Sequence, residues 1–263
     1  MALAAIPFGV AIGVAVGLLG GGGSVLAVPV LVYVLHQDAE TATTISLVVV
    51  TAAALAGGYQ HALTGRVCWR HAGAFTAASL PGIVAGTLLA NVVSGRALIA
   101  GFAIVMLAAA AATWRKATGL GASENDLLER TCPALQLGRD LVAGLVIGLL
   151  TGFFGVGGGF IIVPTLAMAL LFSMRTAIGT SLAIITATSI LGVLVHLGTG
   201  RTLDLELTLA MGAGCVVGAL FGARWSARVP QQVLGRGFAG LVIGVAGYLL
   251  VSAAFLGGPP GSS

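Results

Sequence analysis

The sequence predicts an all-α protein with many membrane-spanning helices. Of its 263 residues, 58% are hydrophobic and only 8% are charged, whereas a soluble domain carries about 25% charged residues. The apolar residues form runs of about 20, the length that crosses the ~30 Å hydrocarbon core of a bilayer. One pattern of glycines, prolines and polar residues also occurs twice, which indicates two related halves.

The repeat is in register over a long stretch of the chain. Gly9 aligns with Gly144, an offset of 135 residues (144 minus 9), and about 22 of 58 ungapped positions are identical. The matched residues are Gly9, Gly13, Gly17, Gly20, Gly22, Gly23 and Pro29 with Gly144, Gly148, Gly152, Gly155, Gly157, Gly158 and Pro164, then Thr41, Ser46, Thr51, His61 and Arg66 with Thr176, Ser181, Thr186, His196 and Arg201. After one added residue, Gly82 and Gly86 match Gly218 and Gly222.

Each half is predicted to contain a glycine-broken helical hairpin and then three transmembrane helices. The apolar segments are 3–19, 24–36, 42–63, 72–93 and 97–114, then 140–154, 159–172, 176–197, 205–226 and 234–255. The predicted units are a first repeat (1–114), a cytoplasmic linker (115–139), a second repeat (140–256) and a disordered tail (257–263). As a helix, the arm 24–36 would span only ~20 Å, so the hairpin is predicted to turn back inside the membrane.

Basic residues predict the orientation, because Lys and Arg concentrate in cytoplasmic loops. If each hairpin enters and leaves on one side, all of the 12 Lys and Arg except Arg96 and Arg201 lie in the cytoplasm. If each hairpin crosses once, the split is about seven to five. The first arrangement is therefore predicted, with both termini outside and the two halves inverted relative to each other.

The two glycine clusters are the first candidates for a binding site. Non-helical backbone at membrane depth is tolerated where protein or a watery cavity satisfies its polar groups. A helix that starts after each cluster would direct free N–H groups and its positive dipole end at the tip, which suits an anion. The candidate residues are Gly20, Gly21, Gly22, Gly23 and Ser24, with Gly155, Gly157, Gly158 and Gly159 in the second half. Close helix packing at the glycines is the alternative, and it is the simplest interpretation of the Gly82/Gly86 and Gly218/Gly222 pairs.

Both clusters lie in a motif that resembles a known family. The stretches GLLGGGGSVLAVP at 17–29 and GFFGVGGGFIIVP at 152–164 resemble the duplicated signature of the TauE/SafE sulfite exporter family. The resemblance covers nearly the whole chain. It implies a permease of the inner membrane for sulfite, organosulfonates or related sulfur oxyanions. The first copy departs from the second at Gly21 and Ser24, where the second has Val156 and Gly159.

Threonines form the second group of candidates. Thr51 and Thr186 lie near the middle of their segments, where their hydroxyls could bind an oxyanion or bond locally to a helix carbonyl. Ser46 and Ser181 lie about five residues, or ~8 Å, from this level and are secondary candidates.

Histidines form the third group. His61 and His196 lie about ten residues, or ~15 Å, from mid-segment, which places them at opposite interfaces. With Arg66 and Arg201 they could attract an anion at each mouth or carry a proton. Ordinary interfacial anchoring is the alternative.

Other residue types narrow the possible functions. The acidic residues Asp38, Glu40, Asp204 and Glu206 lie in predicted loops, which argues against a proton relay through a buried carboxylate. The cysteines Cys68, Cys132 and Cys215 form no C-x-x-C pair and are predicted to form neither a disulfide framework nor a metal site. No cofactor, metal or nucleic-acid partner is expected, because the sequence has no Walker loop and no basic stripe with aromatics.

These features together predict a secondary transporter, since inverted repeats recur in that class. The expected ligand is a small sulfur anion, and the expected surroundings are the lipid bilayer of the plasma membrane. A passive anion channel with the same tips is an alternative. An intramembrane enzyme is another, but it would need a nucleophile with a base, or a metal cluster, at membrane depth. A homo-oligomer is left open.

Overall fold

The computed structural model describes residues 2–35, 37, 39–90, 92, 95–118, 132–134, 136–154, 159–198, 204–226 and 228–255. Over these residues the chain is helical and forms no strand. Gly155, Gly157, Gly158, Arg201, most of the linker and the tail 257–263 lie outside the described residues, as does the side chain of His196.

The helices agree closely with the predicted apolar segments. The first half contains α1 (Ala2–Leu19), a 3-10 segment η1 (Gly20–Leu26), a short α turn α2 (Ala27–Pro29), a π turn η2 (Val30–Val34), α3 (Ala39–Leu63), α4 (Trp69–Ala90) and α5 (Gly95–Thr118). The second half contains α6 (Leu137–Phe154), α7 (Gly159–Met168), α8 (Met174–Gly198), α9 (Leu205–Ser226) and α10 (Gln231–Phe255). Segment length and polar boundaries were sufficient to locate these helices, because both are local properties of the sequence.

Several helices are long and apolar enough to cross a membrane. Five such spans lie in the described part of the chain: Ala5–Val32, Thr41–Leu63, Trp69–Leu89, Met174–Leu194 and Leu205–Ser226. Large apolar side chains on these helices are exposed, among them Leu88 at 65% and Leu209 at 65%. Such a surface is unfavourable in water and favourable in lipid.

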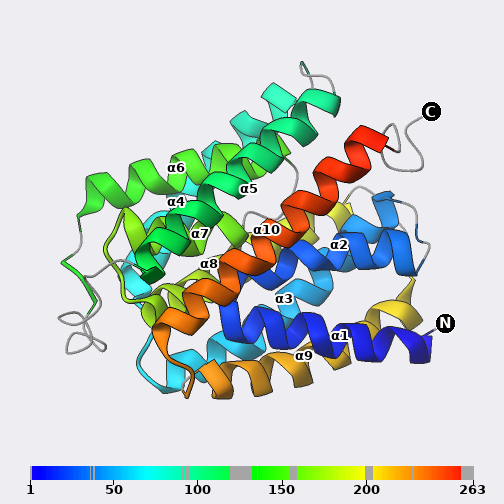
Figure 1. The fold of residues 1–263 in the computed structure, drawn as a ribbon, viewed down its shortest axis with the longest axis horizontal. Helices are drawn as coiled ribbons and strands as arrows, with labels where there is room; N and C mark the ends of the chain where they lie inside the picture. The colour runs from blue at the N-terminus through cyan, green and yellow to red at the C-terminus, as the bar shows by residue number, and fades with distance from the viewer. Residues whose placement is uncertain are drawn as a thin grey trace.

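The start of α1 and the end of α10 lie at one end of the bundle, the terminal end, and the end of α5 and the start of α6 lie at the other, the linker end (Figure 1). Helices α1 and α9 run side by side from the terminal end toward the linker end. Helices α4 and α6 also pack along each other, but they run from the linker end toward the terminal end. The helix that opens the first half therefore runs opposite to the helix that opens the second.

Glycines allow these helix pairs to approach closely. A Cβ at Gly82 or Gly86 of α4 would overlap the α6 backbone, and a Cβ at Gly218 or Gly222 of α9 would overlap the α1 backbone. The prediction that these four glycines are packing residues is confirmed. Contacts between repeat-related elements continue the pattern, since α3 packs on α8 and α5 packs on α10.

Candidate functional site

The first glycine cluster is where the chain folds back on α1. Gly20 has a φ of +71°, a left-handed conformation that glycine adopts without steric cost. Three residues later, a Cβ at Gly23 would lie 2.8 Å from the Val16 side chain. In a continuous helix, residues seven positions apart would be separated by about 10 Å. The cluster therefore breaks the helix and returns the chain along α1.

The returning chain brings the two glycine tips into contact. A Cβ at Gly21 would overlap the backbone of Gly159, the first residue of α7. In the other direction, a Cβ at Gly159 would lie 2.9 Å from Ser24 Oγ and 3.0 Å from the Cα of Gly21. Gly21 and Ser24 of the first cluster therefore lie against Gly159.

Helix α8 lines the contact between the tips. A Cβ at Gly20 would lie 2.8 Å from Ser181 Oγ, and a Cβ at Gly159 would lie 3.0 Å from Ile185 Cδ1. Ser181 is fully buried, and its hydroxyl donates to the Ile178 carbonyl at 2.8 Å. Ser181, a secondary candidate in the sequence, is therefore closer to the first tip than its sequence position indicated.

The first tip differs from the prediction in its backbone. The expectation was a regular helix that starts after the cluster, but Gly20–Leu26 is itself a 3-10 segment and the α turn after it covers only Ala27–Pro29. The Ser24 hydroxyl donates to the Gly21 carbonyl at 2.6 Å. A helix dipole is therefore available mainly in the second half, where α7 continues from Gly159 to Met168.

The two candidate threonines are not equivalent. The Thr51 hydroxyl donates to the Leu47 carbonyl at 2.6 Å, which is the local bond that the sequence left as an alternative. No hydrogen bond to the Thr186 hydroxyl is present among the described residues. Only Thr186 therefore has a hydroxyl proton free for a ligand.

His61 lies inside the bundle. Its side chain is 1% exposed, its Nε2 is 3.4 Å from the Gly17 carbonyl, and its Nδ1 has no partner. A Cβ at Gly179 of α8 would lie 3.1 Å from His61 Cβ. Interfacial anchoring is therefore wrong for His61, because protein surrounds the ring. Arg66 follows closely, and its backbone N–H donates to the His61 carbonyl at 3.0 Å.

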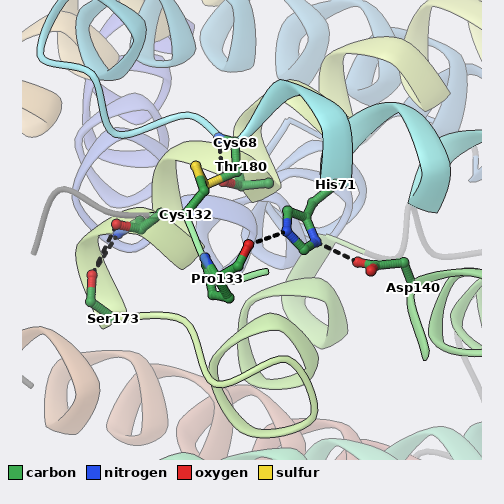
Figure 2. The surroundings of a disulfide bond; sticks show 8 residues. Cys68, His71, Cys132, Pro133, Asp140, Ser173 and Thr180 are labelled. Carbon is green, nitrogen blue, oxygen red and sulfur yellow. Dashed lines mark hydrogen bonds and ion pairs between the residues drawn. A yellow bond between two sulfur atoms is a disulfide. The ribbon is translucent and has the colours of Figure 1, made fainter. Parts of the chain in front are cut away.

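A second polar cluster lies at the linker end, and the sequence did not predict it (Figure 2). Cys68 and Cys132 form a disulfide with a Cα–Cα distance of 5.7 Å, so the prediction of no disulfide is wrong.

His71 and Asp140 form a buried pair in the same cluster, with 2.7 Å between His71 Nδ1 and Asp140 Oδ1. The expectation that acidic residues stay in loops therefore fails at Asp140. The sequence does place these four residues close to the start of α4 or of α6. Which residue pairs with which depends on how α4 and α6 pack, and the sequence pattern does not contain that information.

The third cysteine lies apart from the Cys68–Cys132 disulfide. Cys215 is a free, buried cysteine in α9, where its backbone packs against Gly13. No group of three or more His, Cys, Asp or Glu side chains that could hold a metal occurs in the part of the chain that is described.

The long apolar helices and the exposed apolar surface indicate a polytopic helical membrane protein. The chain belongs to the TauE/SafE sulfite exporter family, whose model matches residues 5–249. A "Probable membrane transporter protein" of Xylella fastidiosa (strain 9a5c) is 34% identical over 247 residues, which is 91% of each chain.

Two relatives in Bacillus subtilis (strain 168) carry similar names. The "Probable membrane transporter protein YunE" is 25% identical and covers 82% of this chain and 84% of its own. The "Probable membrane transporter protein YdhB" is also 25% identical and covers 91% of this chain and 96% of its own. No solved structure matches the chain significantly. The family and its relatives thus establish a membrane transporter.

Proposed function

We propose that this protein is a secondary transporter that carries a small sulfur oxyanion, such as sulfite or an organosulfonate, across the plasma membrane. The family description names sulfite export, which supports this class of substrate. We place the binding site where the two glycine tips meet.

The observation that carries the proposal is the backbone contact between Gly21 and Gly159. Side chains near the tips are uncharged, namely Val16, Leu19, Val163, Ser181 and Phe238. An anion there would be bound by backbone N–H groups and hydroxyls, and by the N-terminal end of α7, which carries roughly half a positive charge. A buried carboxylate at the tips would repel the anion, and no such group is among these neighbours.

The directions of the helices support inverted repeats with re-entrant hairpins. Helices α1 and α6 open the two halves and run in opposite directions (Figure 1). The two tips would then enter the membrane from opposite faces, and each would close the path to one side. Since the tips are in contact, a substrate can bind only when one tip moves away, which is the requirement of alternating access.

Uptake of radiolabelled sulfite into proteoliposomes tests the proposal. The protein should accelerate uptake above protein-free vesicles, with saturation, and unlabelled sulfonate should compete. No acceleration for any sulfur oxyanion would contradict it. The competing proposal, a passive anion channel, predicts flux that rises linearly with concentration and never accumulates sulfite against its gradient. Accumulation driven by a second gradient would exclude the channel.

A further inference from the structure

The pair His71–Asp140 joins α4 to α6 at the linker end of the bundle (Figure 2). His71 Nδ1 lies 2.7 Å from Asp140 Oδ1, and His71 Nε2 lies 3.0 Å from the Pro133 carbonyl oxygen. The ring also packs edge-on against Phe172 at 5.0 Å between centroids. The Pro133 carbonyl can only accept, so Nε2 carries a hydrogen. The contact between Nδ1 and Asp140 holds one further proton, which makes the pair either imidazolium with carboxylate or imidazole with carboxylic acid.

The other half of the protein provides an internal comparison for this pair. The α6–α4 and α1–α9 interfaces have the same parallel register. Between α6 and α4, Gly144 contacts Phe75 and Gly148 contacts Ser79. At the equivalent positions between α1 and α9, Gly9 contacts Met211 and Gly13 contacts Cys215. Four residues earlier on each helix, the positions of Asp140 and His71 correspond to those of Ala5 and Leu207. Ala5 and Leu207 are both buried, at 0% and 4% exposure.

The comparison shows that charge is not needed to join these helices. The equivalent interface has the same glycine contacts with an apolar pair at the same position. Buried ion pairs generally hold helices together no better than apolar side chains of similar volume. A role other than packing therefore accounts better for His71 and Asp140.

The pair has the features of a proton site. Asp140 is fully buried, and its Oδ2 has no hydrogen-bond partner. If the pair releases one proton to water, one ring nitrogen is left with a lone pair that faces an acceptor oxygen. Either the Asp140 contact or the Pro133 contact must then break. Proton occupancy therefore decides whether His71 on α4 keeps both of its hydrogen bonds, to Asp140 on α6 and to Pro133 next to the disulfide-bonded Cys132, or only one of them.

Neighbouring charged groups do not compete for this proton. Arg70 on α4 and Arg139 on α6 adjoin the pair in sequence, and Arg175 at the start of α8 follows Phe172 by three residues. Arg139 donates to Gln136 and to the Ala169 carbonyl, and Arg175 donates to the Val229 carbonyl. Arginine stays protonated in proteins, and α7 carries no titratable residue. Among the groups named, His71 and Asp140 are the ones that share an exchangeable proton, and the other described buried histidine, His61 on α3, lies against Gly17 instead.

We propose that His71 and Asp140 form a proton-binding site, and that proton binding there is coupled to transport of the anion. This inference rests on the proposed transport function and adds the proton as the coupling ion. It also revises the sequence argument against a buried carboxylate, which overlooked Asp140 because it lies at the start of a helix.

Two double variants test the proposal without leaving one charge buried and unpaired. His71→Leu with Asp140→Ala copies the apolar pair of the equivalent interface, so we expect it to fold. His71→Gln with Asp140→Asn keeps hydrogen-bonding groups but cannot exchange a proton near neutral pH. The first measurement is the Tm of the detergent-solubilised protein between about pH 6 and pH 8, the range in which histidine titrates. The wild-type Tm should change across this range, and both double variants should lose that change.

The second measurement is radiolabelled sulfite uptake into proteoliposomes with a pH gradient of one unit, divided by uptake without it. One proton per anion can drive accumulation by about tenfold per pH unit, so the wild-type ratio should rise toward that value for one direction of the gradient. For both double variants the ratio should be about one.

The outcomes separate this proposal from the proposed function. A double variant with the wild-type pH slope of Tm overturns the proton site, and a double variant whose uptake still follows the gradient overturns the coupling. If the wild type carries no sulfur oxyanion, the proposed function fails, while a pH slope of Tm that disappears in both double variants still supports the proton site.

Discussion

The backbone of Gly159 lies so close to Gly21 that Gly21 cannot carry a Cβ unless one of the two segments moves. The two residues are 138 positions apart (159 minus 21) and belong to different halves of the chain. Their contact joins the two breaks in the helical structure, and it is the geometric basis of the proposed anion site.

Gly21→Ala should therefore impair transport. The added methyl would overlap the Gly159 backbone, and overpacking of this kind costs about 1–3 kcal/mol, which corresponds to a loss of about fivefold to about 150-fold in affinity or rate if the cost falls on the bound state. Sulfite uptake by purified, monodisperse protein is the measurement. Gly73→Ala in α4 is the matched control, since nothing lies within 4 Å of its Cβ position. Normal uptake by a folded Gly21→Ala variant would place the site away from the tips.

Glycines between α1 and α9 and between α6 and α4 should determine stability. A Cβ at Gly13 would overlap the Cys215 backbone, and a Cβ at the repeat-related Gly148 would overlap the Ser79 backbone. Gly13→Ala and Gly148→Ala should each lower stability by about 1–3 kcal/mol, a fall of several degrees in Tm. Gly244→Ala in α10 has open space at its Cβ position, so it should leave Tm unchanged or raise it slightly. Equal Tm values for all three variants would show that the close packing is not maintained in solution.

The two central threonines should respond differently to substitution. Thr186→Val removes a hydroxyl that is free to donate, so sulfite affinity should fall by about tenfold to about 150-fold, since a hydrogen bond to a charged group contributes about 1.5–3 kcal/mol. Thr51→Val removes a hydroxyl already bonded to the Leu47 carbonyl at 2.6 Å and should change affinity by less than about threefold. Competition binding to each purified variant measures both. Equal losses would mean that the Thr51 hydroxyl turns toward the ligand when the ligand binds.

The redox state of Cys68 and Cys132 should report the orientation of the protein. Basic residues predict that the linker end faces the cytoplasm, where disulfides are rare. We expect both thiols to be reduced in growing cells, and the bond to form when the purified protein is oxidised. Rapid alkylation of intact cells, followed by mass spectrometry, measures the two states, with the buried thiol of Cys215 as the internal control for a cysteine that stays unpaired. A disulfide already present in cells would place the linker end outside and reverse the predicted orientation.

Local sequence information was sufficient for much of the fold. The segment 205–226 was predicted from apolar length and coincides with α9 (Leu205–Ser226). Gly82 and Gly218 were predicted as packing residues because small residues at four-residue spacing mark close helix contacts. Both predictions depend on properties that lie within a few turns of one helix, so no tertiary information was needed.

Other features could not be predicted from local patterns. The break at Gly20–Ser24 was expected, but the 3-10 backbone of the first arm was not. His61 was placed at an interface by its distance from mid-segment, yet it is buried against Gly17. Helix position along the membrane normal does not reveal which side of the helix faces protein, and here Gly17 of α1 and Gly179 of α8 lie against His61.

By itself, the sequence determined the class of protein, the bounds of its helices, the two repeats and the glycines that form close contacts. These follow from hydrophobic length and from periodic spacing, which act along the chain. Only the tertiary structure decided that Cys68 bonds to Cys132, that His71 pairs with Asp140, and that Gly21 lies on Gly159. Each of these pairs joins segments far apart in the chain, so its formation depends on the register in which α4 packs against α6 and on the reversal of the chain at Gly20.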